Sequence, residues 1–242
     1  MSGALAPWKR QRETSRIENF SDAVFAFAAT LLVVSLEVPQ TFAELAADLH
    51  GFVAFGLSFT ALIVIWHAHT VHFRDFGRTD AVTVILNSLL LFVVLFYVYP
   101  LKFVARGIAV GVLGFDSNGG GSPMVADSQE LAALFMLYSF GFAILFLCFA
   151  LLYGYAYVRR AAYGLSPTDG ARAVFYVRHF LIFTAVGAAS FLLAWQRIGL
   201  TSGMPGWVYF ALGPLCALHG FLSDRGRGRS PAADESERDE QA

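Results

Sequence analysis

Six stretches of this chain are long and apolar enough to cross a lipid bilayer as helices, and no other feature constrains the fold as strongly. A bilayer core about 30 Å thick requires about 20 apolar residues of helix, because in hydrocarbon the backbone satisfies its hydrogen bonds only internally. The stretches are Phe20–Val38, Gly51–His72, Ala81–Val104, Leu131–Val158, Ala171–Trp195 and Gly206–Leu222. The sequence therefore predicts an all-α membrane protein with six transmembrane helices.

The composition agrees with this interpretation and excludes several other classes of protein. Hydrophobic residues make up 57% of the chain and charged residues only 14%, whereas soluble domains carry about 25% charged residues. The 17 Lys and Arg residues and the 18 Asp and Glu residues leave a net charge of -1, so no global basic field attracts a nucleic acid. A disordered chain, a coiled coil and a nucleic-acid-binding protein are excluded.

The sequence contains none of the common motifs for metal binding or catalysis. Cys148 and Cys216 both lie in apolar runs, which favours two small buried hydrophobes over a disulfide or thiolate ligands. No Gly-x-Ser-x-Gly, His-Glu-x-x-His or paired-cysteine motif occurs, and each of these would indicate a specific chemistry. We therefore expect neither an enzyme nor a bound metal or cofactor.

The distribution of basic residues indicates how the helices cross the membrane. If both termini are cytoplasmic, the connections on that side contain 14 of the 17 Lys and Arg residues, and the other side keeps only Lys102, Arg106 and Arg197. Basic residues in short connections resist translocation. The asymmetry therefore favours an even number of spans with both termini in the cytoplasm.

The chain divides into three segments. Residues 1–19 are expected to form a cytoplasmic N-terminal segment, residues 20–223 one six-helix unit without internal repeats, and residues 224–242 a disordered charged tail. The tail carries ten charges in nineteen positions, and such a segment buries too little apolar surface to offset the loss of chain entropy. The turn-rich stretch Asp116–Pro123 predicts a flexible extracytoplasmic loop between the third and fourth helices.

The first predicted helix has two distinct sides. At about 100° per residue, Asp22 points about 140° away from Phe27 and toward neighbouring helices, where a carboxylate requires hydrogen-bond donors or a cation. An alternative is that Ser21 and Asp22 cap the start of this helix near the membrane interface. A second set of residues falls within an arc of about 100° and forms one mostly apolar stripe: Arg16, Phe20, Ala23, Phe27, Thr30, Leu31, Val34 and Val38.

The second predicted helix contains four side chains that could contact Asp22: Trp66, His67, His69 and His72. His69 and His72 are three residues apart and share a helix face. A metal or haem site is disfavoured because no carboxylate or cysteine accompanies them at ligand spacing. We expect a cluster in which Trp and His N–H groups satisfy Ser21 and Asp22, and in which a histidine titrates near neutral pH. Asn87 in the third helix is a further buried amide, which either only joins helices through hydrogen bonds or has a functional role.

These residues together resemble the signature of one membrane-protein family. The string Arg16-x-x-x-Phe20-Ser21-Asp22 at the mouth of the first helix is similar to that of the transmembrane-protein-175 channels, the potassium-permeable channels of endosomes and lysosomes and their prokaryotic relatives. Further matching elements are Trp66-x-x-His69 in the second helix, then Asp80, Asn87 and Pro100 around the third. The resemblance covers roughly residues 12–105. It extends to the last three helices only through their number, length and hydropathy.

The resemblance implies a cation channel whose pore is lined by the first helix. Prokaryotic members of the family carry one six-helix unit and assemble as homotetramers, which matches the single unit here. They narrow the pore with apolar side chains on the first helix, and the matching positions are Phe27, Thr30, Leu31 and Val34. Relatives have Ile or Leu where this chain has Phe27, so the resemblance leaves open whether the family's potassium preference is retained.

The family also has a network behind the pore that holds the helices together. The resemblance assigns this role to residues of the motif and of the two following helices: Arg16, Phe20, Ser21, Asp22, Trp66, His69 and Asn87. Asp22 is in addition a candidate for a response to protons.

Two hypotheses for the function follow. The first is a homotetrameric, potassium-permeable cation channel in a prokaryotic plasma membrane, which passes potassium and in addition other monovalent cations or protons. The alternative is a proton-coupled secondary transporter or a proton-conducting protein that uses Asp22 and the histidines of the second helix. A secondary transporter is less favoured because Pro39 and Pro100 lie near span ends, and no span has a central Gly or Pro break beside an acidic residue.

Overall fold

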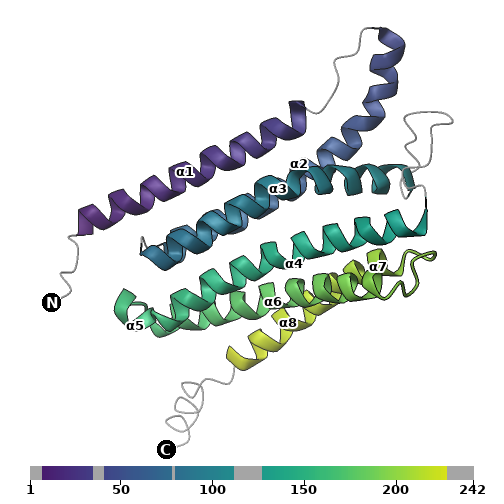
Figure 1. The fold of residues 1–242 in the computed structure, drawn as a ribbon. Helices are drawn as coiled ribbons and strands as arrows, with labels where there is room; N and C mark the ends of the chain where they lie inside the picture. The colour runs from purple at the N-terminus through teal and green to yellow at the C-terminus, as the bar shows by residue number, and fades with distance from the viewer. Residues whose placement is uncertain (1–6, 35–40, 78–79, 112–126, 228–242) are drawn as a thin grey trace, which may run out of the picture.

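The computed structural model describes residues 7–34, 41–77, 80–111 and 127–227, and every regular element in these ranges is a helix (Figure 1). The elements in chain order are α1 (Pro7–Val34), α2 (Phe42–Phe76), α3 (Ala81–Gly111), α4 (Ser128–Val158), α5 (Arg160–Tyr163), α6 (Pro167–Trp195), α7 (Met204–Trp207), the 3-10 helix η1 (Val208–Ala211) and α8 (Leu212–Arg227).

The described helices include six that are long and apolar enough to span a membrane, which confirms the predicted fold class. Five of these spans lie in the single continuous helices α1, α2, α3, α4 and α6, and the sixth is composite, because α7, η1 and α8 follow one another without an intervening loop. The predicted end of the first span at Val38, the loop Asp116–Pro123 and most of the predicted tail, residues 228–242, lie outside the described residues. Within the described part of that tail, α8 continues to Arg227.

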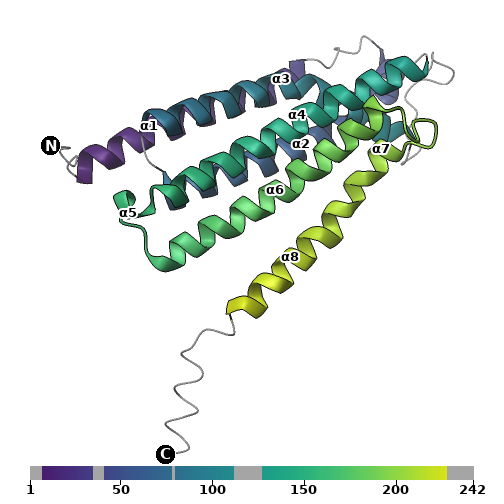
Figure 2. The same ribbon diagram turned by 60° about the horizontal axis from the view of Figure 1, so that its bottom comes forward.

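The long helices run side by side in a bundle whose order in space follows the chain closely (Figures 1 and 2). Helices α1, α2 and α3 pack against one another, α4 lies against α3, and α4 and α6 form the most extensive pair. Helix α8 contacts the bundle mainly through α6 and diverges from it toward its C-terminal end. The start of α1 and the end of α8 lie at the end of the bundle that holds α5, as an even number of crossings requires.

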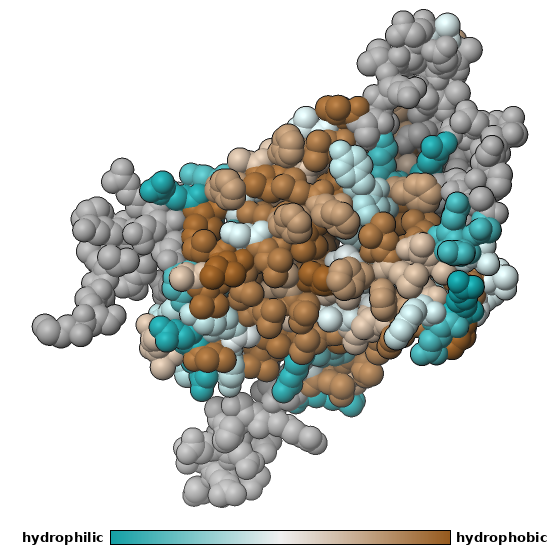
Figure 3. All heavy atoms as spheres, in the orientation of Figure 1, coloured by the Kyte–Doolittle hydropathy of each residue, from teal (hydrophilic) through white to brown (hydrophobic). Residues whose placement is uncertain are grey.

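The surface of the bundle has the polarity of a membrane protein. Figure 3 shows an apolar surface over the middle of the helices, with hydrophilic side chains gathered mainly toward the two ends. The end that holds α5 carries Arg74 in the last turn of α2 and the pair Arg159 and Arg160. The apolar middle and polar ends establish a multi-pass arrangement along the axis of the bundle.

Packing between α4 and α6 depends on close backbone approach at small residues and on large rings elsewhere. A Cβ atom added at Gly187 of α6 would lie 3.1 Å from the backbone nitrogen of Ala143 in α4. Further along the same pair, the ring of Phe149 lies 5.0 Å from that of Phe180, and Tyr153 lies 4.7 Å from Tyr176. In a bilayer such van der Waals packing, rather than removal of apolar surface from water, drives helix association.

The two cysteines differ in burial. Cys148 of α4 is buried in the core as predicted, whereas Cys216 of α8 is only half-buried. The prediction of two buried cysteines was therefore wrong for Cys216. The reason is that α8 diverges from the bundle, so most of its side chains remain exposed.

Asp80 joins the first three helices to the second half of the bundle. Its Oδ1 accepts a hydrogen bond from the backbone N–H of Thr83 at 2.9 Å, which caps the start of α3. Its Oδ2 accepts bonds from the hydroxyls of Tyr155 in α4, at 2.7 Å, and of Tyr163 in α5, at 2.5 Å. Partial burial raises the pKa of Asp80, but the hydrogen bonds from both tyrosines and Thr83 outweigh it and lower the pKa to about 2.

We expect Asp80→Asn to destabilise the folded protein at neutral pH, since the amide accepts fewer and weaker hydrogen bonds. Because the folded-state pKa is depressed, the stabilisation is present above the unfolded pKa near 4 and is lost as pH falls toward 2. After allowance for solvent screening it amounts to about 1 kcal/mol. Thermal unfolding in detergent at pH 7 and at pH 3 measures it, with Asp127→Asn as the matched control, because Asp127 caps α4 without accepting a bond from a tyrosine. Equal destabilisation of the two variants at pH 7 would contradict this role for Asp80.

Candidate functional site

One side of α1 is buried against its own bundle. Ser21, Phe25, Ala28 and Leu32 are each at most 4% exposed, and their spacing places them on one face of the helix. Helix α1 contacts α2 and α3 along this face. The face fixes the rotation of α1 about its own axis.

The opposite side of α1 is the predicted apolar stripe, and most of it is exposed. Phe20 is 62% exposed, Phe27 55% and Val34 71%. Thr30 is also exposed, and its hydroxyl donates a hydrogen bond to the carbonyl of Ala26 at 2.9 Å. Leu31 is only half-buried and packs against the core, so it marks the edge of the stripe. The structure thus brings Phe20, Phe27, Thr30 and Val34 together on a face that its own chain leaves uncovered.

A hydrogen-bonded chain of three buried side chains joins α1, α3 and α2. The hydroxyl of Ser21 donates to the carbonyl of Ile17 at 2.9 Å, so its oxygen accepts the bond from Asn87 Nδ2 at 3.0 Å. The remaining amide oxygen of Asn87 is an acceptor, so His69 Nε2, 2.8 Å away, is the donor. All three residues are at most 3% exposed. Each polar group of this chain therefore satisfies another inside the bundle.

A second bond between α1 and α2 lies beside this chain. Trp66 Nε1 donates to Asp22 Oδ1 at 2.8 Å, as the expected cluster requires. Because α1 begins at Pro7, Ser21 and Asp22 lie in the interior of the helix, and the alternative that they cap its start is wrong. The side chain of Arg16 is exposed, and no hydrogen bond or ion pair links it to a residue within the described ranges. The structure thus joins five of the predicted network residues and leaves Arg16 and Phe20 on the outer side.

His67 and His72 of α2 lie in different surroundings. His72 is buried in a ring cluster, with its centroid 4.5 Å from that of Tyr153 and 5.3 Å from that of Phe73. His67 is exposed on a different side of the helix. Among the described residues, no group of three His, Cys, Asp or Glu side chains is arranged to hold a metal ion. Of the two buried histidines, His69 donates a hydrogen bond and His72 packs against aromatic rings.

Sequence reasoning missed a second buried polar cluster, between α4, α6 and η1. Ser190 Oγ donates to the carbonyl of Pro205 at 2.8 Å, and Ser139 Oγ lies 2.7 Å from it. The hydroxyl of Tyr209 donates to Ser139 Oγ at 3.0 Å. The sequence did contain a signal for this cluster, namely single hydroxyl residues inside apolar runs. In a membrane such hydroxyl groups require hydrogen-bond partners. Their partners depend on how the helices pack.

We expect Asn87→Ala to lower the free energy of unfolding by about 1 to 2 kcal/mol, because it leaves the His69 N–H group without its buried acceptor. Ser88→Ala is the matched control, since Ser88 is the next residue of α3 and is exposed. Equilibrium unfolding of the purified protein in detergent measures both variants. If the two variants unfold alike, the chain from Ser21 to His69 does not hold these helices together.

Comparisons with known proteins agree with the arrangement of these helices. The family model described as the endosomal/lysosomal potassium channel TMEM175 matches residues 16–97, which include most of the residues that form the network. A potassium channel of Marivirga tractuosa is 34% identical over 226 residues, covering 89% of this chain and 90% of the relative. A potassium channel of Chamaesiphon minutus is 39% identical over 104 residues, covering 40% of this chain and 51% of the relative.

Solved structures show the same fold. A variant of the potassium channel MtTMEM175, in complex with a nanobody fusion protein, superposes with a TM-score of 0.76 at 33% identity, covering 87% of this chain and 93% of that chain. A TMEM175 homologue from Chamaesiphon minutus gives a TM-score of 0.53 at 24% identity, over 83% of this chain and 98% of that chain, and this likeness concerns the fold alone. By its identity to a relative over nearly the whole length of both proteins, this chain belongs to the TMEM175 potassium channel family.

Proposed function

We propose that this protein is a potassium-permeable cation channel of a prokaryotic plasma membrane, and not an enzyme. The observation that carries the proposal is the exposed part of the α1 stripe from Phe20 to Val34, which is apolar except for Thr30, while the opposite face of the same helix is fixed by buried hydrogen bonds. Membership of a family whose relatives are named potassium channels supports it. Potassium is accordingly the permeant ion we propose.

The stripe forms a pore only when several copies meet. Helix α1 lies at one edge of the bundle, so its exposed side faces away from the other helices (Figure 2). In a homotetramer, four such stripes around one axis would enclose a pathway and remove Phe27 and Val34 from lipid. An apolar constriction of this kind controls conduction through wetting, without a carbonyl-lined filter.

Within that pathway Thr30 and Phe27 have different roles. The Thr30 hydroxyl donates its hydrogen bond to the carbonyl of Ala26. The lone pairs of the Thr30 oxygen therefore stay available to a partly dehydrated cation. Among the proposed constriction residues, Phe27 alone carries an aromatic ring, and four such rings near an axis would make the narrowest part of the pore. Leu31 lies at the edge of the stripe and connects the constriction to the core.

The network behind the stripe holds α1 in place while ions pass. Asn87 and His69 bind α1 through Ser21, and Trp66 binds it through Asp22. Loss of these bonds would let α1 rotate and change which side chains face the axis. We assign Arg16 and Phe20 to contacts at the mouth of the pathway, because both are exposed on the stripe side of the helix.

We place both termini in the cytoplasm. The ends of α1 and α8 share one end of the bundle, and that end also carries Arg74, Arg159 and Arg160. Lys102 and Arg106, in the last turns of α3, and Arg197 lie toward the other end. Basic residues are retained on the cytoplasmic side of a membrane.

Potassium flux in liposomes tests the proposed function. We expect the purified protein to pass potassium down its gradient when no proton gradient is present, and to do so as a tetramer by native mass measurement. A flux that strictly required an opposing proton gradient would instead support the proton-coupled transporter that uses Asp22 and the histidines of α2. Empty liposomes are the control.

We expect Phe27→Ala to raise single-channel conductance and to lower discrimination between potassium and sodium, since it removes the bulkiest ring from the constriction. Phe92→Ala is the matched control, because Phe92 of α3 is 67% exposed but lies outside the stripe. Recordings in mixed potassium and sodium compare the two variants, after each is shown to assemble as the wild type does. A Phe27→Ala channel that is indistinguishable from wild type would place the constriction elsewhere.

A further inference from the structure

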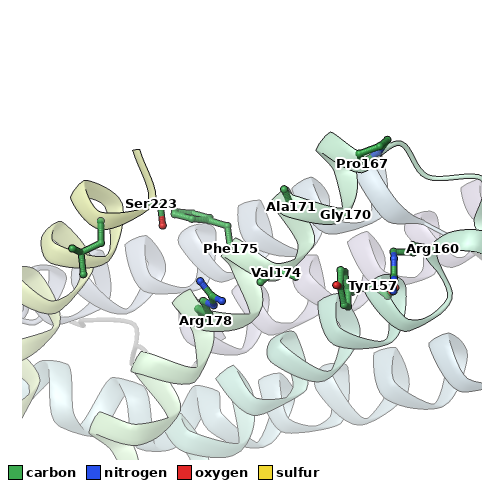
Figure 4. Close-up of a pocket in the computed structure, with 10 residues that line it drawn as sticks. Tyr157, Arg160, Pro167, Gly170, Ala171, Val174, Phe175, Arg178 and Ser223 are labelled. Carbon is green, nitrogen blue, oxygen red and sulfur yellow. The ribbon is translucent and has the colours of Figure 1, made fainter. Parts of the chain in front are cut away.

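A pocket lies at the α5 end of the bundle, where α8 diverges from α6 (Figures 2 and 4). It has a volume of about 510 Å3 and is lined by the end of α4, by α5, by the first turns of α6 and by the end of α8. In Figure 4, Arg178 and Arg160 lie toward opposite sides of the pocket, with Val174 between them. The pocket therefore presents two guanidinium groups across an apolar floor.

The charges of the two arginines are only partly used within the chain. Arg160 donates one hydrogen bond to the carbonyl of Tyr157 at 3.0 Å and lies 4.3 Å from the Tyr157 ring centroid, and the described residues offer its other N–H donors no acceptor. For Arg178, no described residue forms a hydrogen bond or an ion pair with the guanidinium group. A cation near the end of a membrane helix bundle requires an anion or water.

The carboxylates of the described residues lie outside the lining of the pocket. None of the residues that line the pocket is acidic. Asp169 adjoins the lining residue Gly170, but its Oδ2 accepts hydrogen bonds from the backbone and the hydroxyl of Ser166 in the capping box of α6. Asp224 follows the lining residue Ser223 and also lies outside the lining. The charged side chains that line the pocket are therefore both positive.

The lining of the pocket combines apolar side chains with a few polar ones. Val174, Phe175 and Leu222 form an apolar side that continues into the exposed apolar face of α8, where Phe221 and Leu218 are more than half exposed. The polar groups of the lining include the hydroxyl of Ser223 and the two arginines, which approach the pocket from opposite sides. A phosphate paired with guanidinium groups, with acyl chains leaving along apolar helices, matches this combination of polar and apolar groups.

We propose that this pocket binds the phosphate of an anionic membrane phospholipid, with Arg160 and Arg178 as its ligands and the acyl chains along α8. The lipid fills the space between α6 and α8. It also neutralises the charge of two arginines for which no described residue forms an ion pair. Lipid binding at this site is independent of the proposed ion pathway, because the pocket and α1 lie on opposite sides of the bundle.

Lipid titration of the full-length protein in detergent, followed by native mass spectrometry, tests the proposal. We expect phosphatidylglycerol to bind once per subunit and more tightly than phosphatidylcholine. Arg178→Gln and Arg160→Gln should each weaken phosphatidylglycerol binding about five-fold, and the double variant about 25-fold, while phosphatidylcholine binding stays unchanged. Arg178→Lys should retain most of the binding, because it keeps the charge.

Three comparisons make the result decisive. Arg159→Gln removes the charge next to Arg160, but Arg159 does not line the pocket, so equal weakening in this control would indicate general surface charge and overturn the proposal. Displacement of the lipid by an equal concentration of glycerol 3-phosphate would show a site for a soluble phosphate and would also overturn it. The same holds if Arg178→Gln alters assembly in lipid-free detergent, because the arginine then pairs with a neighbouring subunit. Unchanged phosphatidylglycerol binding in the double variant rejects the pocket outright.

Discussion

The hydrogen-bonded chain from Ser21 through Asn87 to His69 is the interaction on which the rest of the structure depends. In the interior of a membrane bundle these polar groups have no water to bind, so each must find a partner on another helix. In the observed arrangement, Ser21, Asn87 and His69 each donate a hydrogen bond to an acceptor within the bundle. That arrangement fixes the rotation of α1 relative to α2 and α3.

Fixing the rotation of α1 divides the helix into two faces with opposite requirements. Phe25, Ala28 and Leu32 are buried with Ser21, and Phe27, Thr30 and Val34 must then face outward. An exposed apolar stripe on a helix at the edge of a bundle is compatible with contact with lipid. In the proposed function, other copies of the chain cover the stripe, and it then lines the pore. The polar chain and the proposed pore are thus two sides of one helix, and a change in the first alters the geometry of the second.

Different interactions hold the second half of the bundle together. Helices α4 and α6 approach closely at Gly187 and interleave their aromatic rings, with a small hydroxyl cluster at Ser139 and Ser190. The two halves meet at their α5 end, where Asp80 binds Tyr155 and Tyr163 and where Arg172 forms an ion pair with Asp75 at 3.2 Å. Helix α8 takes little part in this packing, which is why a pocket opens beside it.

The amino-acid sequence by itself determined the six spans, the stripe on the first helix and the placement of basic residues at one end of the bundle. These features are local, since hydropathy over about 20 residues and the helical period depend only on neighbouring positions. It also indicated that Asp22 and Asn87 require partners, and that Trp66 and His69 were candidates. The tertiary structure alone decided that Asn87 bridges Ser21 and His69, that Asp80 binds two tyrosines and that Arg178 borders a pocket. The bonds from Asn87 to Ser21 and from Tyr163 to Asp80 join residues 66 and 83 positions apart. The rotation and spacing of packed helices set such contacts, and no local pattern in the chain encodes them.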